Sequence, residues 1–189
     1  MKRIAVFASG QGSNAANLIR YFQDHPKARI CWVASNRASA PVLQRAAELG
    51  VEATYIKAED WTNGSVLAEL QRRGIDLIVL AGFLKLVPAS IIHAYDHRIV
   101  NIHPSLLPKF GGAGMYGMNV HRAVVAAGEK ETGITIHFVN EHFDEGEVIA
   151  QYKTEVLPTD QPEDVERKVR ELETKYFGIE VEQVMMRDW

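Results

Sequence analysis

Asp76-Leu-Ile-Val-Leu-Ala-Gly82 is a stretch with no polar side chain after its first residue. A strand of a parallel sheet has this continuous apolar character when helices cover both of its faces, whereas a half-exposed strand alternates. A similar apolar run occupies residues 4–8, and residues 99–102 repeat the pattern with Asn101 as the one polar residue. We therefore expect these segments to form the buried centre of a parallel sheet.

Helical patterns separate these runs along the first half of the chain. Leu18, Ile19 and Phe22 recur at helical spacing after the first run. Residues 38–49 and 59–73 each carry an apolar stripe and are predicted as single helices, preceded by strands at 30–34 and 51–56. This alternation is typical of an α/β fold with a single doubly wound, mostly parallel sheet and helices on both faces.

The pattern changes in the C-terminal half. Residues 134–138 alternate, with apolar side chains on one face and Thr135 and His137 on the other, which predicts a half-exposed antiparallel strand. The pattern leaves His137 open between a solvent-facing residue and a site residue. A strand at 148–156 follows, and then a last helix, with Asp160 expected as its N-cap and Glu163 as the partner in a capping box.

The bulk composition describes an ordinary globular chain. Its 189 residues fit one domain, 47% of them are hydrophobic and 24% are charged. The net charge of −3, with scattered basic residues, indicates no nucleic-acid partner. The longest apolar run, residues 77–84, is too short for a membrane span, and the N-terminus does not have the pattern of a signal peptide. We expect a cytoplasmic protein whose single cysteine, Cys31, is buried and structural.

A glycine-rich turn, Ser9-Gly10-Gln11-Gly12-Ser13-Asn14, joins the first strand to the first helix. Such a turn aims backbone N–H groups and a helix N-terminus at an anion, which favours a phosphate site. Gly10, Gly12 and Ala15 also match a loose dinucleotide fingerprint, but the second strand ends in Ser35-Asn36-Arg37 without the carboxylate that a ribose requires. A bare tight turn and a dinucleotide site remain the alternatives.

A second candidate site begins at Asn101-Ile-His-Pro104. Pro104 keeps His103 extended, and side chains two apart on an extended segment share a face. Asn101 and His103 should therefore point together beyond the strand end, where an amide donor beside an imidazole suits acyl chemistry. The alternative is a polar strand end that is closed by a proline loop. Parallel topology would bring residues 9–14, 82–87 and 101–103 to one edge of the sheet.

Two later features have ordinary structural interpretations. Asp144 precedes Glu145-Gly146 in a turn, where an aspartate usually only binds backbone N–H groups. Arg170 and Glu173 lie three apart on the last helix, which is typical of a solvated ion pair. Residues 109–119 lie between Pro104 and Asp144 in the chain. They hold four glycines and cannot form core.

Four segments together resemble the phosphoribosylglycinamide formyltransferases, a family within the formyltransferase superfamily. They are SGQGSN after a strand, LAGFLKLV, NIHPSLLPKF and GITIHFVNEHFDEGEVIAQ, in that order, and the likeness extends from Lys2 to about Phe177. The NIHPSLLP segment belongs to the whole superfamily, whereas SGQGSN narrows the choice to this family. The resemblance implies transfer of the formyl group of 10-formyltetrahydrofolate to the amine of glycinamide ribonucleotide, in de novo purine biosynthesis.

The resemblance also implies roles for individual residues. The catalytic residues would be Asn101, His103 and Asp144, with Asp144 orienting His103 and raising its pKa. The ribonucleotide would contact Gly12, Ser13, Asn14, Arg170 and Glu173, although Arg170 is not the residue type expected there. The folate would contact Leu84, Lys85, Leu86, Val87, Asn101, Asn140, Glu141, His142, Phe143 and Asp144. Within the single domain, residues 1–100 would form a phosphate-binding half and residues 101–189 a folate and catalytic half.

The chain departs from the family's pattern at two places. Asn63-Gly64-Ser65 offers no arginine where relatives often contact the folate, and residues 111–117 replace a shorter Pro-Gly loop. Three competing functions are a formyltetrahydrofolate hydrolase, a methionyl-tRNA formyltransferase and a non-catalytic nucleotide-binding module. The reaction is expected to need no metal, and the sequence has neither HExxH nor a Cys/His cluster. The protein would be a monomer or a homodimer.

Overall fold

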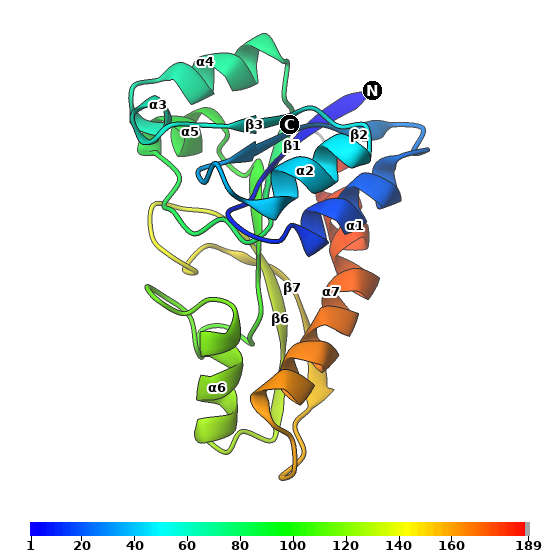
Figure 1. The fold of residues 1–189 in the computed structure, drawn as a ribbon, viewed down its shortest axis with the longest axis vertical. Helices are drawn as coiled ribbons and strands as arrows, with labels where there is room; N and C mark the ends of the chain where they lie inside the picture. The colour runs from blue at the N-terminus through cyan, green and yellow to red at the C-terminus, as the bar shows by residue number, and fades with distance from the viewer. Residues whose placement is uncertain (188–189) are drawn as a thin grey trace.

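The computed structural model describes residues 1–187, in which the strands form a seven-stranded sheet of order β3-β2-β1-β4-β5-β6-β7 (Figure 1). The strands are β1 (Lys2–Phe7), β2 (Ala28–Ser35), β3 (Ala53–Tyr55), β4 (Leu77–Leu80), β5 (Ile99–His103), β6 (Glu131–Phe138) and β7 (Val148–Glu155). Neighbours from β3 to β5 pair in parallel, while β5–β6 and β6–β7 pair antiparallel. The predicted doubly wound, mostly parallel sheet with an antiparallel C-terminal part is confirmed.

Helices cover the two faces of the sheet unequally. The helices are α1 (Ser13–Phe22), α2 (Pro41–Glu48), α3 (Ala58–Thr62), α4 (Ser65–Arg72), α5 (Ala89–Ala94), α6 (Met118–Ala126) and α7 (Pro162–Met185). One buried cluster joins α1, α2, α6 and α7 to the sheet, and a second cluster joins α3, α4 and α5 to the other face. No helix within residues 1–187 combines the length and the apolar composition that crossing a membrane requires.

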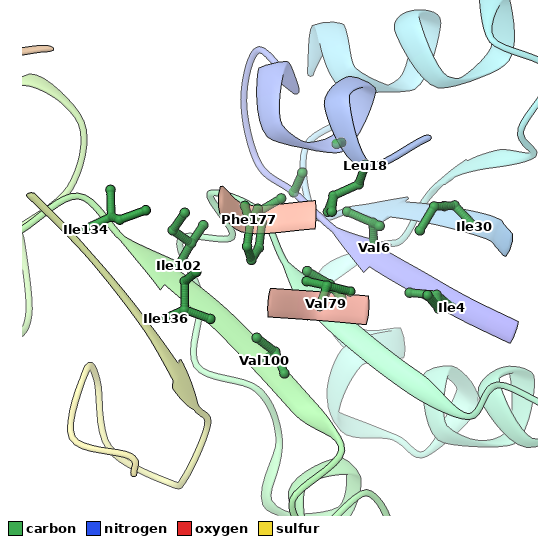
Figure 2. Packing of buried hydrophobic residues seen from close by; sticks show 14 of the residues in the cluster. Ile4, Val6, Leu18, Ile30, Val79, Val100, Ile102, Ile134, Ile136 and Phe177 are labelled. Atoms are coloured by element: carbon green, nitrogen blue, oxygen red, sulfur yellow. The ribbon is translucent and has the colours of Figure 1, made fainter. Parts of the chain in front are cut away.

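The continuous apolar runs divide their side chains between these two clusters. In β1, Ile4 and Val6 face α1 and α7, whereas Ala5 and Phe7 face the opposite cluster. Figure 2 shows Ile4 and Val6 on the first face, together with Phe177 of α7. Helix α7 packs against both α1 and α6, so it joins the first helix to the antiparallel part of the sheet (Figure 1).

The prediction that residues 134–138 form a half-exposed strand is wrong, because β6 is buried from Thr132 to Phe138. Its apolar side chains face α6 and α7, as expected. Its other face is covered by the loop that follows β5, since the Leu107 N–H donates to Thr135 Oγ1 at 3.0 Å. A Cβ added to Gly133 would lie 2.9 Å from Leu106 Cδ2 and 1.8 Å from the Tyr152 carbonyl oxygen. Glycine is therefore required at this position, mainly because the backbone of β7 comes so close and also because the Leu106 side chain lies against it.

Several predicted boundaries also need correction. Residues 59–73 form two helices, because Gly64 has φ +91° and ends the helical path between α3 and α4. Helix α7 is capped by Gln161 with Asp164, and Asp160 instead accepts from the Leu157 N–H and binds Lys168. Strand β3 covers only Ala53–Tyr55 of the predicted 51–56. The prediction that Cys31 is buried is also wrong, since the residue is half-buried.

Candidate active site

A cavity of about 380 Å³ lies at the edge of the sheet where the parallel strands end. This volume is within the range of small-molecule sites in proteins, about 300–1,000 Å³. Its walls come from the glycine-rich turn before α1, the segment after β4, the end of β5, the turn after β6 and one side of α7. The three strand ends that sequence analysis brought to one edge therefore line a single cavity.

Asn101 and His103 share a face of β5 and both line the cavity, as the spacing predicts. His103 is only 4% exposed, and its Nε2 lies 2.8 Å from the Phe110 carbonyl oxygen. A carbonyl can only accept, so Nε2 carries a proton. His103 Nδ1 then faces Asp144 Oδ2 at 3.4 Å.

Burial sets the pKa of His103 below its usual value. The carboxylate of Asp144 and the Phe110 carbonyl oppose this effect by raising the pKa, and His137 adds a further lowering. The influence of Asp144 on the pKa of His103 therefore has the predicted sign, although burial outweighs it. The imidazole is thus mainly neutral at pH 7, so it can accept a proton.

Asp144 lies between two histidines. It has a φ of +57°, and its Oδ2 accepts from the Gly112 N–H at 3.0 Å while its Oδ1 is 3.7 Å from His137 Nε2. Burial raises the pKa of Asp144, but His137, His103 and the Gly112 N–H together outweigh it and lower the pKa. Asp144 is therefore an ionised carboxylate with a fixed orientation.

His137 is a site residue that sequence reasoning left open. It is 2% exposed, pairs in register with Asn101, and places Nε2 3.1 Å from Asn101 Nδ2. Its Nδ1 lies 2.8 Å from the Phe138 carbonyl oxygen and so carries the proton, which leaves Nε2 to accept from the Asn101 amide. The alternation of residues 134–138 placed His137 on the correct face, but only the strand register shows that it lies beside Asn101.

The opposite end of the cavity is formed by the glycine-rich turn. Gly12 has φ +77°, and a Cβ on it would lie 2.4 Å from Val42 Cγ2. No side chain caps α1, so the N–H groups of its first turn are free of intrahelical partners at the cavity wall. Ser35, at the end of β2, is fully buried and accepts from the Arg37 N–H, so no carboxylate stands where a dinucleotide ribose would need one.

The α7 residues do not pair as predicted. The Arg170 guanidinium binds Glu166 at 2.7 Å rather than Glu173, so the expected Arg170–Glu173 surface pair is wrong. Glu173 instead interacts with Asn14; burial raises its pKa, and Asn14 and Arg170 oppose that rise only partly. His121 of α6 also lines the cavity, is 3% exposed and has no hydrogen-bond partner at Nδ1. Nothing in its sequence context distinguishes it from a core residue.

The predicted folate residues lie along the remaining wall of the cavity, with one exception. Those that line it are Leu84, Lys85, Leu86, Val87, Asn140, His142, Phe143 and Asp144. Glu141 is not among the lining residues, since its carboxylate binds His93 Nε2 at 2.8 Å on the protein surface. Leu86, Tyr116 and Phe143 are exposed and line the cavity, and they offer apolar surface to a ligand's ring system.

The loop at residues 111–117 reaches Asp144. A Cβ on Gly111 would lie 2.5 Å from Leu107 Cδ2 and 3.3 Å from Asp144 Cβ, so glycine permits the close approach there. The rest of the loop is held mainly by its own bonds, such as Asn119 Nδ2 to the Gly114 carbonyl at 3.1 Å. Among residues 1–187, no group of three or more His, Cys, Asp or Glu side chains is arranged to hold a metal ion.

The sequence is similar to known formyl transferases over most of its length. Residues 2–180 match the formyl transferase family. The chain is 37% identical over 186 residues to the phosphoribosylglycinamide formyltransferase of Haemophilus influenzae, covering 95% of this chain and 85% of that protein. It is 37% identical over 183 residues to a chloroplastic phosphoribosylglycinamide formyltransferase of Arabidopsis thaliana, covering 93% of this chain but spanning only 63% of that protein.

A solved structure gives the same relationship. The crystal structure of phosphoribosylglycinamide formyltransferase from Streptococcus pneumoniae superposes with a TM-score of 0.87 at 34% identity. The superposition covers 98% of this chain and 100% of that one. The likeness therefore extends over both the parallel and the antiparallel parts of the sheet.

Proposed function

The chain belongs to the formyl transferase family, and we propose that it transfers the formyl group of 10-formyltetrahydrofolate to the amine of glycinamide ribonucleotide, a step of purine biosynthesis. The observation that carries the proposal is that one cavity joins an anion site to an acyl-transfer site. The turn at Gly12 forms the first, and the group of Asn101, His103 and Asp144 forms the second. A phosphorylated amine and a formyl donor could meet between them.

The proposed ribonucleotide lies with its phosphate against Gly12, Ser13 and Asn14. Free N–H groups and the positive end of the helix dipole favour a phosphate there. Glu173, close to Asn14 and partly buried, would accept hydrogen bonds from the ribose hydroxyls. This arrangement directs the glycinamide amine toward Asn101 and His103. Helix α7 would thus bring part of the C-terminal half to the ribonucleotide. The division into a phosphate-binding half at residues 1–100 and a folate and catalytic half at residues 101–189 stays a prediction.

The proposed folate lies along the wall formed by residues 84–87 and 140–144. Backbone groups in these two segments would hold the flat polar ring of the pteridine. The exposed side chains of Leu86 and Phe143 would contact the less polar part of the molecule. The formyl carbon would then lie in front of Asn101, within reach of the incoming amine.

Attack of the amine on the formyl carbon converts its oxygen into an oxyanion. Asn101 has two amide hydrogens, of which one faces His137 Nε2 and the other remains to donate to the oxyanion. Losing one such donor typically lowers the rate about 100- to 1,000-fold. His137 would thereby hold the Asn101 amide in the orientation that stabilisation requires.

The adduct then loses a proton from its nitrogen, and the departing folate nitrogen gains one. His103 is buried with a lowered pKa, so it can accept that proton on Nδ1 beside the Asp144 carboxylate. The ionised Asp144 stabilises the imidazolium while it exists. The proton passes to the folate nitrogen, the C–N bond to folate breaks, and the carbonyl re-forms on the new amide.

The competing functions differ in the acceptor of the formyl group. A hydrolase would use water with the same three residues, and it would have no use for a phosphate site. A methionyl-tRNA formyltransferase would require basic surface for the RNA, which a net charge of −3 does not provide. A non-catalytic module would have no use for the group of Asn101, His103 and Asp144 at the wall of the cavity.

One assay tests the proposal and separates the competitors. The protein is incubated with 10-formyltetrahydrofolate, with and without glycinamide ribonucleotide, and loss of the formyl group from folate is followed. We expect loss only when the ribonucleotide is present, and a rate lower by about 100-fold or more in the His103→Ala variant. Loss without ribonucleotide would identify a hydrolase, and no loss under either condition would reject the proposal.

A further inference from the structure

His103, Thr135 and Gln151 form a row across three neighbouring strands. His103 pairs in register with Thr135 of β6, and Thr135 pairs with Gln151 of β7. Paired residues of an antiparallel ladder lie on the same face of the sheet. Gln151 is on the edge strand and does not line the cavity, so it has no contact with a substrate placed there.

The hydroxyl of Thr135 joins this row to the loop after β5. It donates to the Ser105 carbonyl at 2.7 Å and accepts from the Leu107 N–H at 3.0 Å and from Gln151 Nε2 at 2.9 Å. One donor hydrogen and two lone pairs are the full capacity of a hydroxyl, so none is left unpaired. Thr135 is fully buried, where a missing partner would be costly.

Gln151 completes the hold on Leu107. Its Nε2 lies 2.9 Å from the Leu107 carbonyl oxygen, so its two amide hydrogens serve Leu107 and Thr135. Both the N–H and the carbonyl of Leu107 are therefore tied to the sheet. Farther along, Ser105 Oγ donates to the Lys109 carbonyl at 2.6 Å, which closes the loop on itself.

The loop ends at the carbonyl that orients the catalytic imidazole. Phe110 follows Lys109 directly, and its carbonyl accepts from His103 Nε2 at 2.8 Å. That bond keeps the proton on Nε2 and leaves Nδ1 facing Asp144. A shift of the loop would move the Phe110 carbonyl and permit the other tautomer or a rotated ring.

We propose that Gln151 is a positioning residue that fixes the tautomer and orientation of His103 through Thr135, Leu107 and the Phe110 carbonyl. Gln151 lies on the edge strand, away from the cavity, and acts by donating hydrogen bonds to the Leu107 carbonyl and to Thr135 Oγ1. The kinetic part of this inference rests on the proposed formyl transfer, whereas the tautomer can be observed without any substrate.

The test compares two substitutions of similar length. Gln151→Met keeps the volume and removes both donors, whereas Gln151→Lys keeps donors that can reach Thr135 Oγ1 and the Leu107 carbonyl. Gln151 is an exposed residue, so either side chain can be accommodated without a cavity in the core. Lys153→Met, two residues along the same strand, removes a surface bond to Glu131 and is the matched control.

The imidazole state is read by ¹⁵N NMR of histidine-labelled protein, with His103→Gln identifying the signal. We expect the wild type, Gln151→Lys and Lys153→Met to show the Nε2-protonated form, and Gln151→Met to show a mixture of tautomers. In the transfer assay, Gln151→Met should lower kcat about 10- to 100-fold, the effect of a misplacement near 1 Å, with both KM values nearly unchanged. The apparent pKa of its kcat profile should also move.

The outcomes separate the two proposals. A wild-type tautomer and kcat in Gln151→Met would overturn the positioning role, as would equal losses in Gln151→Met and Gln151→Lys. If the wild type transfers no formyl group while Gln151→Met still shows mixed tautomers, the positioning role stands and the proposed function fails.

Discussion

The two ends of the cavity present their polar groups in different ways. The proposed phosphate end, formed by Gly12, Ser13 and Asn14, offers backbone N–H groups at a helix N-terminus. The proposed catalytic end, formed by Asn101, His103, His137 and Asp144, offers buried or half-buried side chains that lie within 4 Å of one another. The first should respond to changes of backbone shape, and the second to changes of chemical group. Substitutions at the phosphate end should therefore change the affinity for the ribonucleotide, and substitutions at the catalytic end should change the rate of the chemical step.

The architecture explains this division. The parallel part of the sheet has helices on both faces, so its polar groups gather where strands end and helices begin. In the antiparallel part, α6 and α7 cover one face of β6, while a loop and the turn carrying Asp144 cover the other. Side chains from β5 and β6 can therefore meet between these two covers.

The largest effect is expected for His103→Ala at the catalytic end. Loss of the group that moves the proton should lower kcat about 100- to 10,000-fold. The KM values for both substrates should change little, because neither the phosphate turn nor the folate wall is altered. Steady-state kinetics with each substrate varied in turn would measure this. A rise in ribonucleotide KM with an unchanged kcat would contradict the claim that this end of the cavity serves the chemical step and not ribonucleotide binding.

Asp144→Asn should give a smaller loss of kcat, about 100-fold, with folate binding nearly intact. The carboxylate raises the pKa of His103 against the lowering by burial. Its removal therefore lowers that pKa further, and the acid limb of the kcat profile should move to lower pH. A pH–rate profile of the variant against the wild type tests the sign. A limb displaced to higher pH would contradict the electrostatic role of Asp144.

Gly12→Val tests the phosphate end. The residue has φ +77° and its Cβ would meet Val42, so the turn must change shape. We expect the ribonucleotide KM to rise about 10-fold or more, the scale of one lost hydrogen bond to a charged group, while the folate KM changes far less. Gly50→Val is the control, since Gly50 has the same φ but open space around it. Equal rises in both KM values would reject the phosphate assignment.

The smallest effect concerns the glycine-rich loop between the two ends. Residues 111–117 hold Gly111, Gly112, Gly114 and Gly117, whose ordering costs about 1 kcal/mol or more per residue. We expect amide hydrogen exchange there to slow when ribonucleotide and a folate analogue are added. The turn at Gly128, outside the cavity, should exchange unchanged. Unaltered protection of the loop would mean that it does not order around the substrates.

The parallel half could be predicted from sequence because its strands carry their own signature. Each apolar run is buried on both faces, so burial by helices follows from the run itself. Asn101 and His103 were predictable for a related reason: Pro104 and the two-residue spacing fix their common face whatever the partner strand is.

The errors share a different cause, which is contact between distant segments. The alternation in β6 suggested exposure, because a local pattern cannot reveal that the loop at Leu106 and Leu107 returns to cover Thr135. His137 could be assigned only once its register with Asn101 was known. Arg170 binds Glu166, while the neighbouring Glu173 interacts with Asn14, a contact between α7 and the first turn of α1 that no local pattern reveals.

The central claim is that Asn101, His103 and Asp144 act as one unit on the formyl carbon. Single-turnover transfer rates of the three single variants Asn101→Ala, His103→Ala and Asp144→Asn, compared with the rate of the triple variant, test it most directly. Residues that act as a unit are non-additive, so we predict that the triple variant is scarcely slower than the slowest single variant. Losses that multiply to the triple value, or wild-type transfer by His103→Ala, would contradict the account.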